Sequence, residues 1–254
     1  MTQTLAVDYS FSRPSPATIK SHGYTAVGRY LGGSSGKRIT RDEATSLHAA
    51  GLGIWLVWET SADRARSGNA GGVSDAHAAA AAALAVGYPT SCPLFFAVDF
   101  DATPAQVSAY FAGIRSVLGN RAGIYGGIKV TEAGLAHWRW QTAAWSGGKV
   151  DPAAHLYQRT KMTHPIGGCD ENVICHPIPL WTAAGVSKPA EKPAKEKPAA
   201  TKKKAAKKPE HPAAVQDEIK DLKDLQHKQE ASGHPQRAEH TKDAKKALKQ
   251  EKNQ

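Results

Sequence analysis

The chain has 254 residues and a formal net charge of +10, and 41% of its residues are hydrophobic, enough for one large domain or two small ones. All six Trp, seven Tyr and five Phe lie at or before residue 181, and the rest is dominated by Lys, Ala, Pro, Glu and Gln. A segment without aromatic residues cannot build a core of its own. We therefore predict one folded domain over residues 1–183, a basic Lys/Pro-rich linker over 184–213, and a short amphipathic helix with a charged tail over 214–254.

The positive charge is concentrated in the tail. Residues 1–185 carry 15 Lys and Arg against 12 Asp and Glu, whereas residues 186–254 carry 18 against 11, which argues against a basic binding face on the folded domain. The segment Lys188–Lys208 has nine Lys, two Glu and no Arg or aromatic residue. It predicts salt-sensitive binding to an anionic polymer, either a wall polymer or nucleic acid, or it serves only as a soluble spacer. The apolar positions Ile219, Leu222 and Leu225 leave self-association through that helix open.

Short apolar segments recur along the folded part and alternate with helix-like segments. Eight of them are predicted to be strands: residues 5–10, 26–32, 53–59, 93–101, 121–127, 141–145, 154–159 and 171–176. Helix starts are marked by the capping pattern at Thr40 and by Thr103 before Pro104. Eight strands in this alternation predict a compact α/β protein, a (β/α)8 TIM-type barrel with short or missing last helices.

The sequence predicts no metal, cofactor or membrane span. No G-x-G-x-x-G or P-loop pattern follows a strand, and Cys92, Cys169 and Cys175 lack metal-type spacing. Cys169 and Cys175 either form a disulfide or remain reduced thiols. The Ala-rich segment 76–87 is too short to cross a bilayer. The start of the chain lacks a basic, then apolar, leader, which predicts synthesis in the cytoplasm without a signal peptide.

Carboxylates mark the ends of several predicted strands. Asp99 and Asp101 end the fourth strand, and regular alternation would direct both side chains to the same side of it. Asp8 and Glu59 end the first and third strands. Asp170 stands just before the eighth. Active sites of (β/α)8 barrels lie at the carboxyl ends of the strands, so we expect these five acids to converge there. Crowded carboxyl groups raise one another's pKa, which suits glycoside hydrolysis by one protonated and one ionised acid. The alternative is that each acid only caps the following helix.

Aromatic and basic residues accompany these acids. Flat rings with polar edges stack on sugars, although the same residues could pack in the core. The predicted substrate-binding residues are Tyr9, Arg29, Tyr30, Trp58, Tyr125, Trp145 and Tyr157. Arg29 and Arg159 either pair with the acids or hold an acidic substituent of the substrate.

The ordered segments VDYS, FFAVDFDA, GIYGG, LYQRT and DENV resemble the glycoside-hydrolase-like domain of actinobacterial cell-wall proteins and their phages, a family related to the family-25 lysozymes. The resemblance covers about residues 4–181. It implies a catalytic set of Asp8, Asp99, Asp101 and Asp170, with Asp101 as general acid and Asp99 stabilising the charged intermediate or orienting the substrate. The lysozymes have Glu where this chain has Asp101, and a carboxyl group drawn back by about 1 Å can cost about a hundredfold in rate. Glu59 is the candidate that supplies the missing reach.

Two functional hypotheses follow. The first is a muramidase-like glycoside hydrolase directed at the glycan of peptidoglycan, acting at the bacterial cell wall as an endolysin or wall-associated enzyme. The second is a non-catalytic glycan-binding or structural protein, for example a tail component of a phage particle.

Overall fold

A computed structural model describes residues 3–187 of the chain. The basic segment Lys188–Lys208, the helix predicted around Ile219–Leu225 and most of the predicted linker lie outside these residues.

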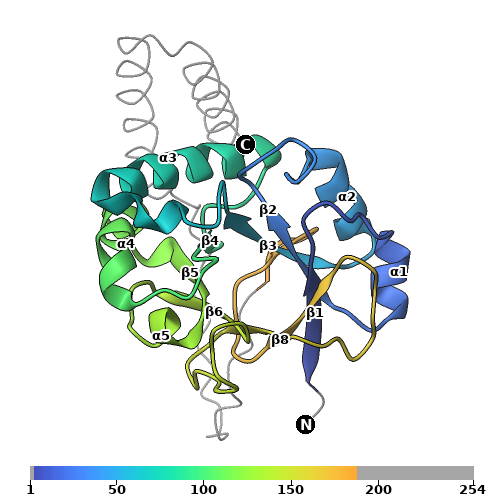
Figure 1. Cartoon of the computed structure of the whole chain (residues 1–254). Helices are drawn as coiled ribbons and strands as arrows, with labels where there is room; N and C mark the ends of the chain where they lie inside the picture. Colours follow the sequence, from blue (N-terminus) through green and yellow to red (C-terminus); the bar gives the residue numbers. More distant parts are fainter. Residues whose placement is uncertain (1–2, 188–254) are drawn as a thin grey trace, which may run out of the picture. The chain divides into compact units, whose positions relative to one another are not determined.

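Eight strands close into a barrel (Figure 1). They are β1 (Thr4–Asp8), β2 (Ala26–Tyr30), β3 (Gly53–Trp58), β4 (Leu94–Ala97), β5 (Ala122–Gly126), β6 (Trp138–Thr142), β7 (Leu156–Gln158) and β8 (Asp170–Ile174). Each strand pairs with the next in the chain, and β8 pairs with β1 to complete the circle. The predicted α/β barrel is confirmed.

The last strand runs against the others. Strands β1 to β7 pair in parallel, but β8 is antiparallel to both β7 and β1. In a barrel of eight parallel strands, a residue at the start of a strand would lie at the end opposite to the carboxyl ends. The reversal instead brings Asp170, at the start of β8, into register with Asp8, at the end of β1.

Helices cover the first part of the barrel more completely than the last. They are α1 (Pro16–Ser21), α2 (Arg41–Ala49), α3 (Gly68–Val86), α4 (Pro104–Leu118) and α5 (Ile128–Thr131), with 3-10 turns η1 (Arg64–Ser67) and η2 (Gly119–Arg121). Within residues 3–187 no helix separates β6 from β7 or β7 from β8, in agreement with the predicted short or missing last helices. The caps are as the sequence indicates: the Thr40 hydroxyl accepts a hydrogen bond from the Glu43 amide, and Thr103 and Gln106 form a capping box.

The two long helices touch through glycines. A Cβ on Gly72 of α3 would overlap the carbonyl oxygen of Tyr110 on α4, and a Cβ on Gly113 of α4 would overlap that of Asn69 on α3. Only a residue without a side chain allows the backbones to approach this closely.

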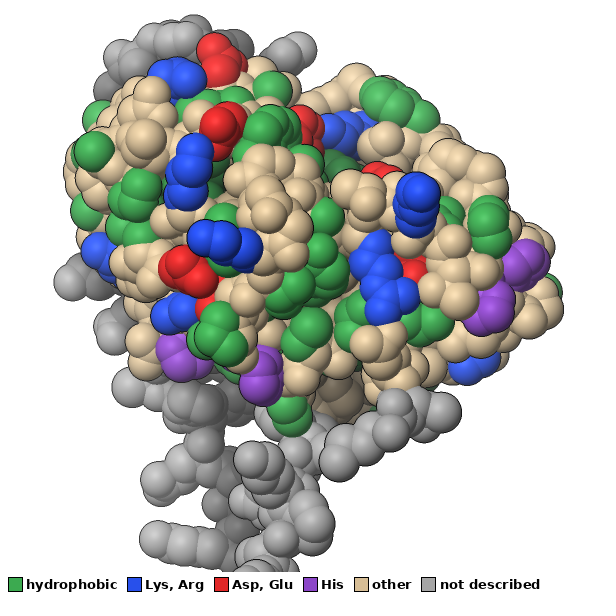
Figure 2. Space-filling model, turned by 60° about the horizontal axis from the view of Figure 1, so that its bottom comes forward, with side chains coloured by type: hydrophobic (Ala, Val, Ile, Leu, Met, Phe, Trp, Pro, Cys, Tyr) green, Lys and Arg blue, Asp and Glu red, His purple; other side chains and the backbone are tan. Residues whose placement is uncertain are grey.

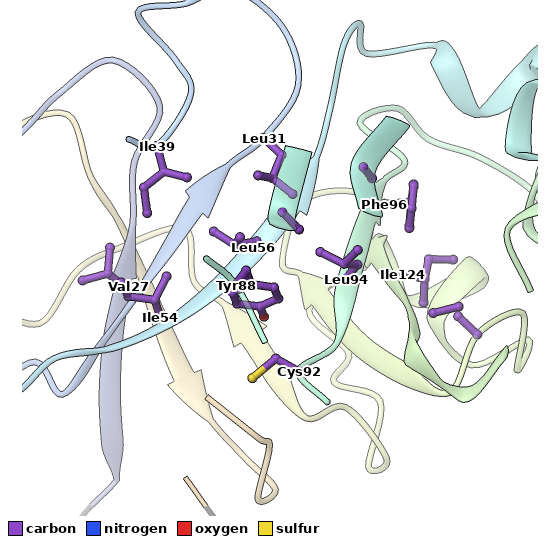
Figure 3. Packing of buried hydrophobic residues seen from close by; sticks show 14 of the residues in the cluster. Val27, Leu31, Ile39, Ile54, Leu56, Tyr88, Cys92, Leu94, Phe96 and Ile124 are labelled. Atoms are coloured by element: carbon purple, nitrogen blue, oxygen red, sulfur yellow. The ribbon is translucent and has the colours of Figure 1, made fainter. Parts of the chain in front are cut away.

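Side-chain alternation along the strands divides the apolar residues into two clusters. The outer cluster fills the space between strands and helices and includes Val27, Ile54, Leu56, Leu94 and Phe96 (Figure 3). The inner cluster fills the barrel itself, and its members are Ala6, Ala26, Trp55, Val57, Phe95, Ala97, Trp140, Leu156 and Ile178.

Edge-to-face rings form the middle of the barrel. The ring centroids of Trp140 and Trp55 are 5.4 Å apart, and those of Trp140 and Phe95 are 5.8 Å apart. Gly28 and Gly123 face these rings, and a Cβ on either would lie 2.6 Å from them. The large rings therefore leave no aqueous pore below the carboxyl end of the barrel.

After the barrel, a short hairpin of β9 (Trp181–Thr182) and β10 (Gly185–Val186) returns to β3, where Trp181 pairs with Ile54. The Trp181 ring packs edge-on against His48 and Tyr88, with centroids 4.5 and 5.7 Å away. Cys92, Cys169 and Cys175 are free thiols in this structure. Among the helices of residues 3–187, none has both the length and the apolar character needed to cross a bilayer.

Acidic and basic side chains are interspersed on the face of the barrel domain shown in Figure 2, without a large patch of one sign. This distribution agrees with the near balance of charges in residues 1–185.

Candidate active site

Polar side chains replace apolar ones at the carboxyl end of the barrel interior. The alternation that directs Ala6, Trp140 and Leu156 inward continues to Asp8 on β1, and it brings Gln158 on β7 and Asn172 on β8 to the same side. Asp8 and Asn172 are fully buried, and Gln158 is nearly so. A buried polar group is costly unless it is hydrogen-bonded, and the Gln158 and Asn172 amides both donate to Asp8.

Two amides hold Asp8 by one oxygen. Oδ2 accepts hydrogen bonds from Gln158 Nε2 at 2.8 Å and from Asn172 Nδ2 at 2.7 Å. A second hydrogen bond orients each amide on its oxygen side. Trp140 Nε1 donates to Asn172 Oδ1 at 2.7 Å, and the Tyr125 hydroxyl donates to Gln158 Oε1 at 2.7 Å. An indole N–H can only donate, so it fixes which end of the Asn172 amide faces Asp8.

The other oxygen of Asp8 is left for a proton. Oδ1 has no well-formed hydrogen bond to any residue of the described barrel domain. Burial raises the pKa of Asp8 from 3.8 to about 7, the Asn172 and Gln158 hydrogen bonds and the Tyr30 hydroxyl oppose the rise, and the charge of Asp170 adds to it. Since Oδ2 already accepts two N–H groups, a proton on Asp8 is best placed on Oδ1.

Glu59 and Asp99 stand at the ends of the neighbouring strands β3 and β4 and share one cation. Lys37 Nζ lies 2.7 Å from Glu59 Oε1 and 4.2 Å from the centroid of the Tyr30 ring. Asp99 is half-buried, and its pKa is raised, first by burial and then by the charge of Glu59, while Lys37 acts in the opposite direction. Two nearby carboxyl groups therefore have different surroundings: Glu59 is paired with Lys37, and Asp99 is half-buried with a raised pKa.

Asp170 is the fourth acid at this end of the barrel. It lies opposite Asp8 in the pairing of β8 with β1, and burial raises its pKa. Asp8, Glu59, Asp99 and Asp170 interact through their charges with one another or with the same buried tyrosines, Tyr30 and Tyr125.

Asp101 lies apart from that group. The predicted strand over 93–101 ends at Ala97, so regular alternation does not carry Asp101 to the side of Asp99. Its side chain is 54% exposed and forms an ion pair with Lys129 Nζ at 2.9 Å, on the short helix after β5. The extension of this strand to residue 101 was wrong, because the last backbone bond to β5 is made by Val98.

Tyr9 and Arg29, both predicted to bind substrate, are on the outside of the barrel. Arg29 is buried against α2, where Nε donates to Glu43 Oε1 at 2.7 Å and Nη2 donates to the Lys37 carbonyl oxygen at 3.1 Å. Its guanidinium lies 4.3 Å from the centroid of the Tyr9 ring, and the Tyr9 hydroxyl donates to Glu43 at 3.1 Å. All these groups are partnered within the protein, and the strand alternation that points Tyr30 inward points Arg29 outward. Arg159 pairs with the buried Glu171 at 2.8 Å.

The remaining predicted aromatic residues divide between core and surface. Tyr30 and Tyr125 pack against the inner cluster, and Trp58 packs against the outer one. Tyr157 alternates with the inward-facing Leu156 and Gln158 and so faces outward. Trp145 is exposed in the loop after β6.

Three residues of the site were missed by sequence reasoning. Gln158 and Asn172 had a usable signal, because each is a polar residue two positions from an apolar one on the inward face of a short strand. Lys37 lies in the loop before α2, where no periodicity indicates its direction. Within residues 3–187 no three His, Cys, Asp or Glu side chains are arranged to hold a metal ion.

Comparisons with known proteins place this arrangement in a family. The model of the Rv2525c-like, glycoside hydrolase-like domain matches residues 17–174. The Mycobacterium tuberculosis protein named "Putative peptidoglycan hydrolase Rv2525c" is 29% identical over 195 residues, which cover 67% of this chain and 80% of that protein. The uncharacterized protein YbfG of Bacillus subtilis is 32% identical over 144 residues, 46% of this chain but only 20% of that protein.

The crystal structure of the Tat-secreted Rv2525c protein in complex with L-tartrate superposes with a TM-score of 0.63 and 27% sequence identity, covering 68% of this chain and 96% of that one. The resemblance expected from the strand-end segments is thus confirmed, and the chain belongs to the family of Rv2525c-like, glycoside hydrolase-like domains.

Proposed function

We propose that the carboxyl end of the barrel binds the glycan strands of bacterial peptidoglycan and hydrolyses a glycosidic bond in them. The observation that carries the proposal is the contrast between two carboxyl groups on adjacent strands. Asp99 is half-buried with a raised pKa, and Glu59 is ion-paired with Lys37. Glycosidases separate an acid and an ionised partner in this way. The name of the M. tuberculosis relative supports the choice of peptidoglycan as substrate.

In this proposal Asp99 donates its proton to the leaving glycosidic oxygen as the bond to the anomeric carbon breaks. Glu59 faces the developing positive charge and either activates water or attacks the anomeric carbon itself. Water supplies the hydroxyl group of the new reducing end. If Glu59 attacks, Asp99 takes the proton of the water that releases the intermediate; if Glu59 activates the water, Glu59 takes that proton, and exchange with solvent then restores both carboxyl groups. Asp8 and Asp170 lie at the same end of the barrel and add negative potential at the oxocarbenium-like centre when they are ionised.

This assignment differs from the one that the family-25 resemblance implies, in which Asp101 is the general acid. The Asp101 carboxyl group is exposed and paired with Lys129, whereas Asp99 is half-buried beside Glu59. We assign Asp101 to the rim of the site.

The test is digestion of purified actinobacterial cell wall with measurement of new reducing ends. Wild type is expected to release them, and Asp99→Asn to lower the rate by about a hundredfold or more, the range for loss of a general acid. Asp101→Asn serves as the matched control and is expected to keep most of the rate. Equal release by wild type and an Asp99→Asn/Glu59→Gln double variant would contradict the proposal.

A non-catalytic glycan-binding protein, such as a phage tail component, is the second candidate. It is favoured by one observation, the exposed and ion-paired Asp101 at the position where the lysozymes have Glu. It predicts that wall pull-down survives in the double variant while no reducing ends appear with wild type.

The wall pull-down also measures how much the basic segment Lys188–Lys208 contributes to binding. We propose that Lys188–Lys208 adds an attraction to anionic wall polymers, and that the protein acts at the cell wall or in a phage particle. Removing residues 188–254 is then expected to weaken wall binding at low salt and to have little effect at high salt. Nucleic acid in place of wall polymer, and self-association through Ile219–Leu225, are tested by adding DNA and by measuring molecular mass.

A further inference from the structure

The loop after β6 contains an unusual backbone conformation. Trp145 has a φ of 55°, and no other residue except glycine has a positive φ within the described residues 3–187. The left-handed region is unfavourable for a bulky side chain, so such a residue persists only where its surroundings impose it.

Hydrogen bonds from two sides impose this conformation. The buried Ser146 hydroxyl donates to the Thr142 carbonyl oxygen at 2.6 Å and accepts from the Ile128 amide at 3.0 Å, which ties the loop to the start of α5. On the other side, the Ala143 amide donates to the Gln158 carbonyl oxygen at 2.9 Å, which ties it to β7. The backbone of Trp145 is thus fixed between β5 and β7.

A glycine makes room for Trp145 at the end of β5. A Cβ on Gly127 would lie 3.2 Å from Trp145 Cβ and 3.3 Å from the carbonyl oxygens of Ala144 and Trp145. Gly127 follows the strand that carries Tyr125, so Trp145 lies at the same end of the barrel as the acidic group.

Trp145 is only partly buried despite its unfavourable backbone conformation. The residue is 38% exposed, although a large ring contributes to stability mainly when it is buried. A strained, rigidly held and exposed aromatic residue at the rim of a candidate site points to a ligand that covers the ring.

We propose that Trp145 is a stacking platform for one pyranose ring of the glycan strand, next to the carboxyl groups. The identity of the ligand rests on the proposed function, whereas the platform itself rests on the conformation, exposure and position of Trp145. An indole face suits the apolar C–H face of a sugar, and a side chain already held in place loses little freedom when the sugar binds.

The experiment measures the affinity of soluble four-sugar glycan-strand fragments by calorimetry, in the Asp99→Asn background so that no cleavage occurs. Trp145→Asn removes the ring and keeps a residue that tolerates the left-handed region, and Trp145→Phe keeps a flat ring. Val150→Asn, an exposed apolar residue farther along the same loop, is the matched control. We expect Kd to rise about ten- to thirtyfold for Trp145→Asn, as for loss of a central aromatic contact, and about threefold or less for the other two.

Thermal unfolding separates binding from folding, since Trp145→Asn is expected to unfold at the same temperature as the background variant or higher. An unchanged Kd for Trp145→Asn, or a loss of affinity equal to that of Val150→Asn, would overturn the platform. Wall cleavage by wild type together with an unchanged Kd refutes the platform and leaves the hydrolase. Binding that depends on Trp145, without cleavage by wild type, supports the platform and refutes the hydrolase.

Discussion

Replacing Asp8 by Asn keeps the shape of a buried side chain and removes its charge. In wild type the carboxyl group has a pKa of about 7 in the folded protein, against an ordinary value of 3.8 that describes the unfolded chain. The folded state therefore binds the proton more tightly than the unfolded state, and stability that is present at low pH is lost as the pH rises from 3.8 through 7. The Asp8→Asn variant has no such transition.

The size of the effect follows from the two pKa values. A difference of about three pH units corresponds to about 4 kcal/mol in the free energy of unfolding, reached above pH 7. Between pH 5 and pH 8 the wild type should lose about 2–3 kcal/mol more than the variant. The introduced amide can still accept from Gln158 and Asn172 with its oxygen, and its nitrogen then occupies the place of Oδ1 beside Tyr30. Any cost of that nitrogen is independent of pH and cancels from the comparison.

Urea unfolding of both proteins at pH 5, 6, 7 and 8 measures the difference directly. The stability of the variant relative to wild type should increase as the pH rises. Titrating groups distant from Asp8 contribute equally to both proteins, and the weak coupling of Asp8 to Asp170 is a smaller effect than burial. A difference that stays constant from pH 5 to pH 8 would refute the reasoning, since it would mean that Asp8 is ionised in the folded protein throughout this range.

Three further predictions concern stability. Asn172→Leu leaves the Trp140 indole N–H without a partner and removes one of the two amide hydrogen bonds to Asp8, that of Gln158 remaining. It should lower the free energy of unfolding by about 2–4 kcal/mol and raise the pKa of Asp8 further, as followed by carbon NMR of its carboxyl group. Gly72→Ala forces α3 away from Tyr110 and should cost about 2 kcal/mol or more in urea unfolding. Burial and the charges of His176, His137 and Arg139 lower the pKa of His155 from 6.5 to about 4, against the effect of Asp151, so stability should fall as the pH drops from 6.5 towards 4. Partial exposure reduces that loss to about 1–2 kcal/mol, and His155→Gln should abolish it in acid titrations.

Local patterns were sufficient to predict the barrel. Short apolar segments and capped helices at Thr40 and Thr103 gave the order of elements, because each depends on residues a few positions apart. The direction of β8 depends on how the chain returns to β1, and no nearby residue indicates it. That reversal, which the sequence pattern did not reveal, sets Asp170 beside Asp8.

The site was predictable to the extent that strand alternation held. Alternation places Asp8 inside the barrel, but β4 ends at Ala97, and beyond that point Asp101 turns to Lys129. A residue near the end of a strand can also face the helices. Arg29 does so, because it pairs with Glu43 on α2 and does not point into the barrel. Lys37, in contrast, is a loop residue that belongs to the site. It does so through its contacts with Glu59 and Tyr30, which form only in the folded chain.

The central claim is that Asp99, and not Asp101, supplies the proton in cleavage of the glycan. Its most direct test is the release of reducing ends from purified cell wall by wild type, Asp99→Asn and Asp101→Asn at equal protein concentration. We predict release by wild type and by Asp101→Asn, and a rate lower by about a hundredfold or more for Asp99→Asn. Release that persists in Asp99→Asn and disappears in Asp101→Asn would contradict the claim.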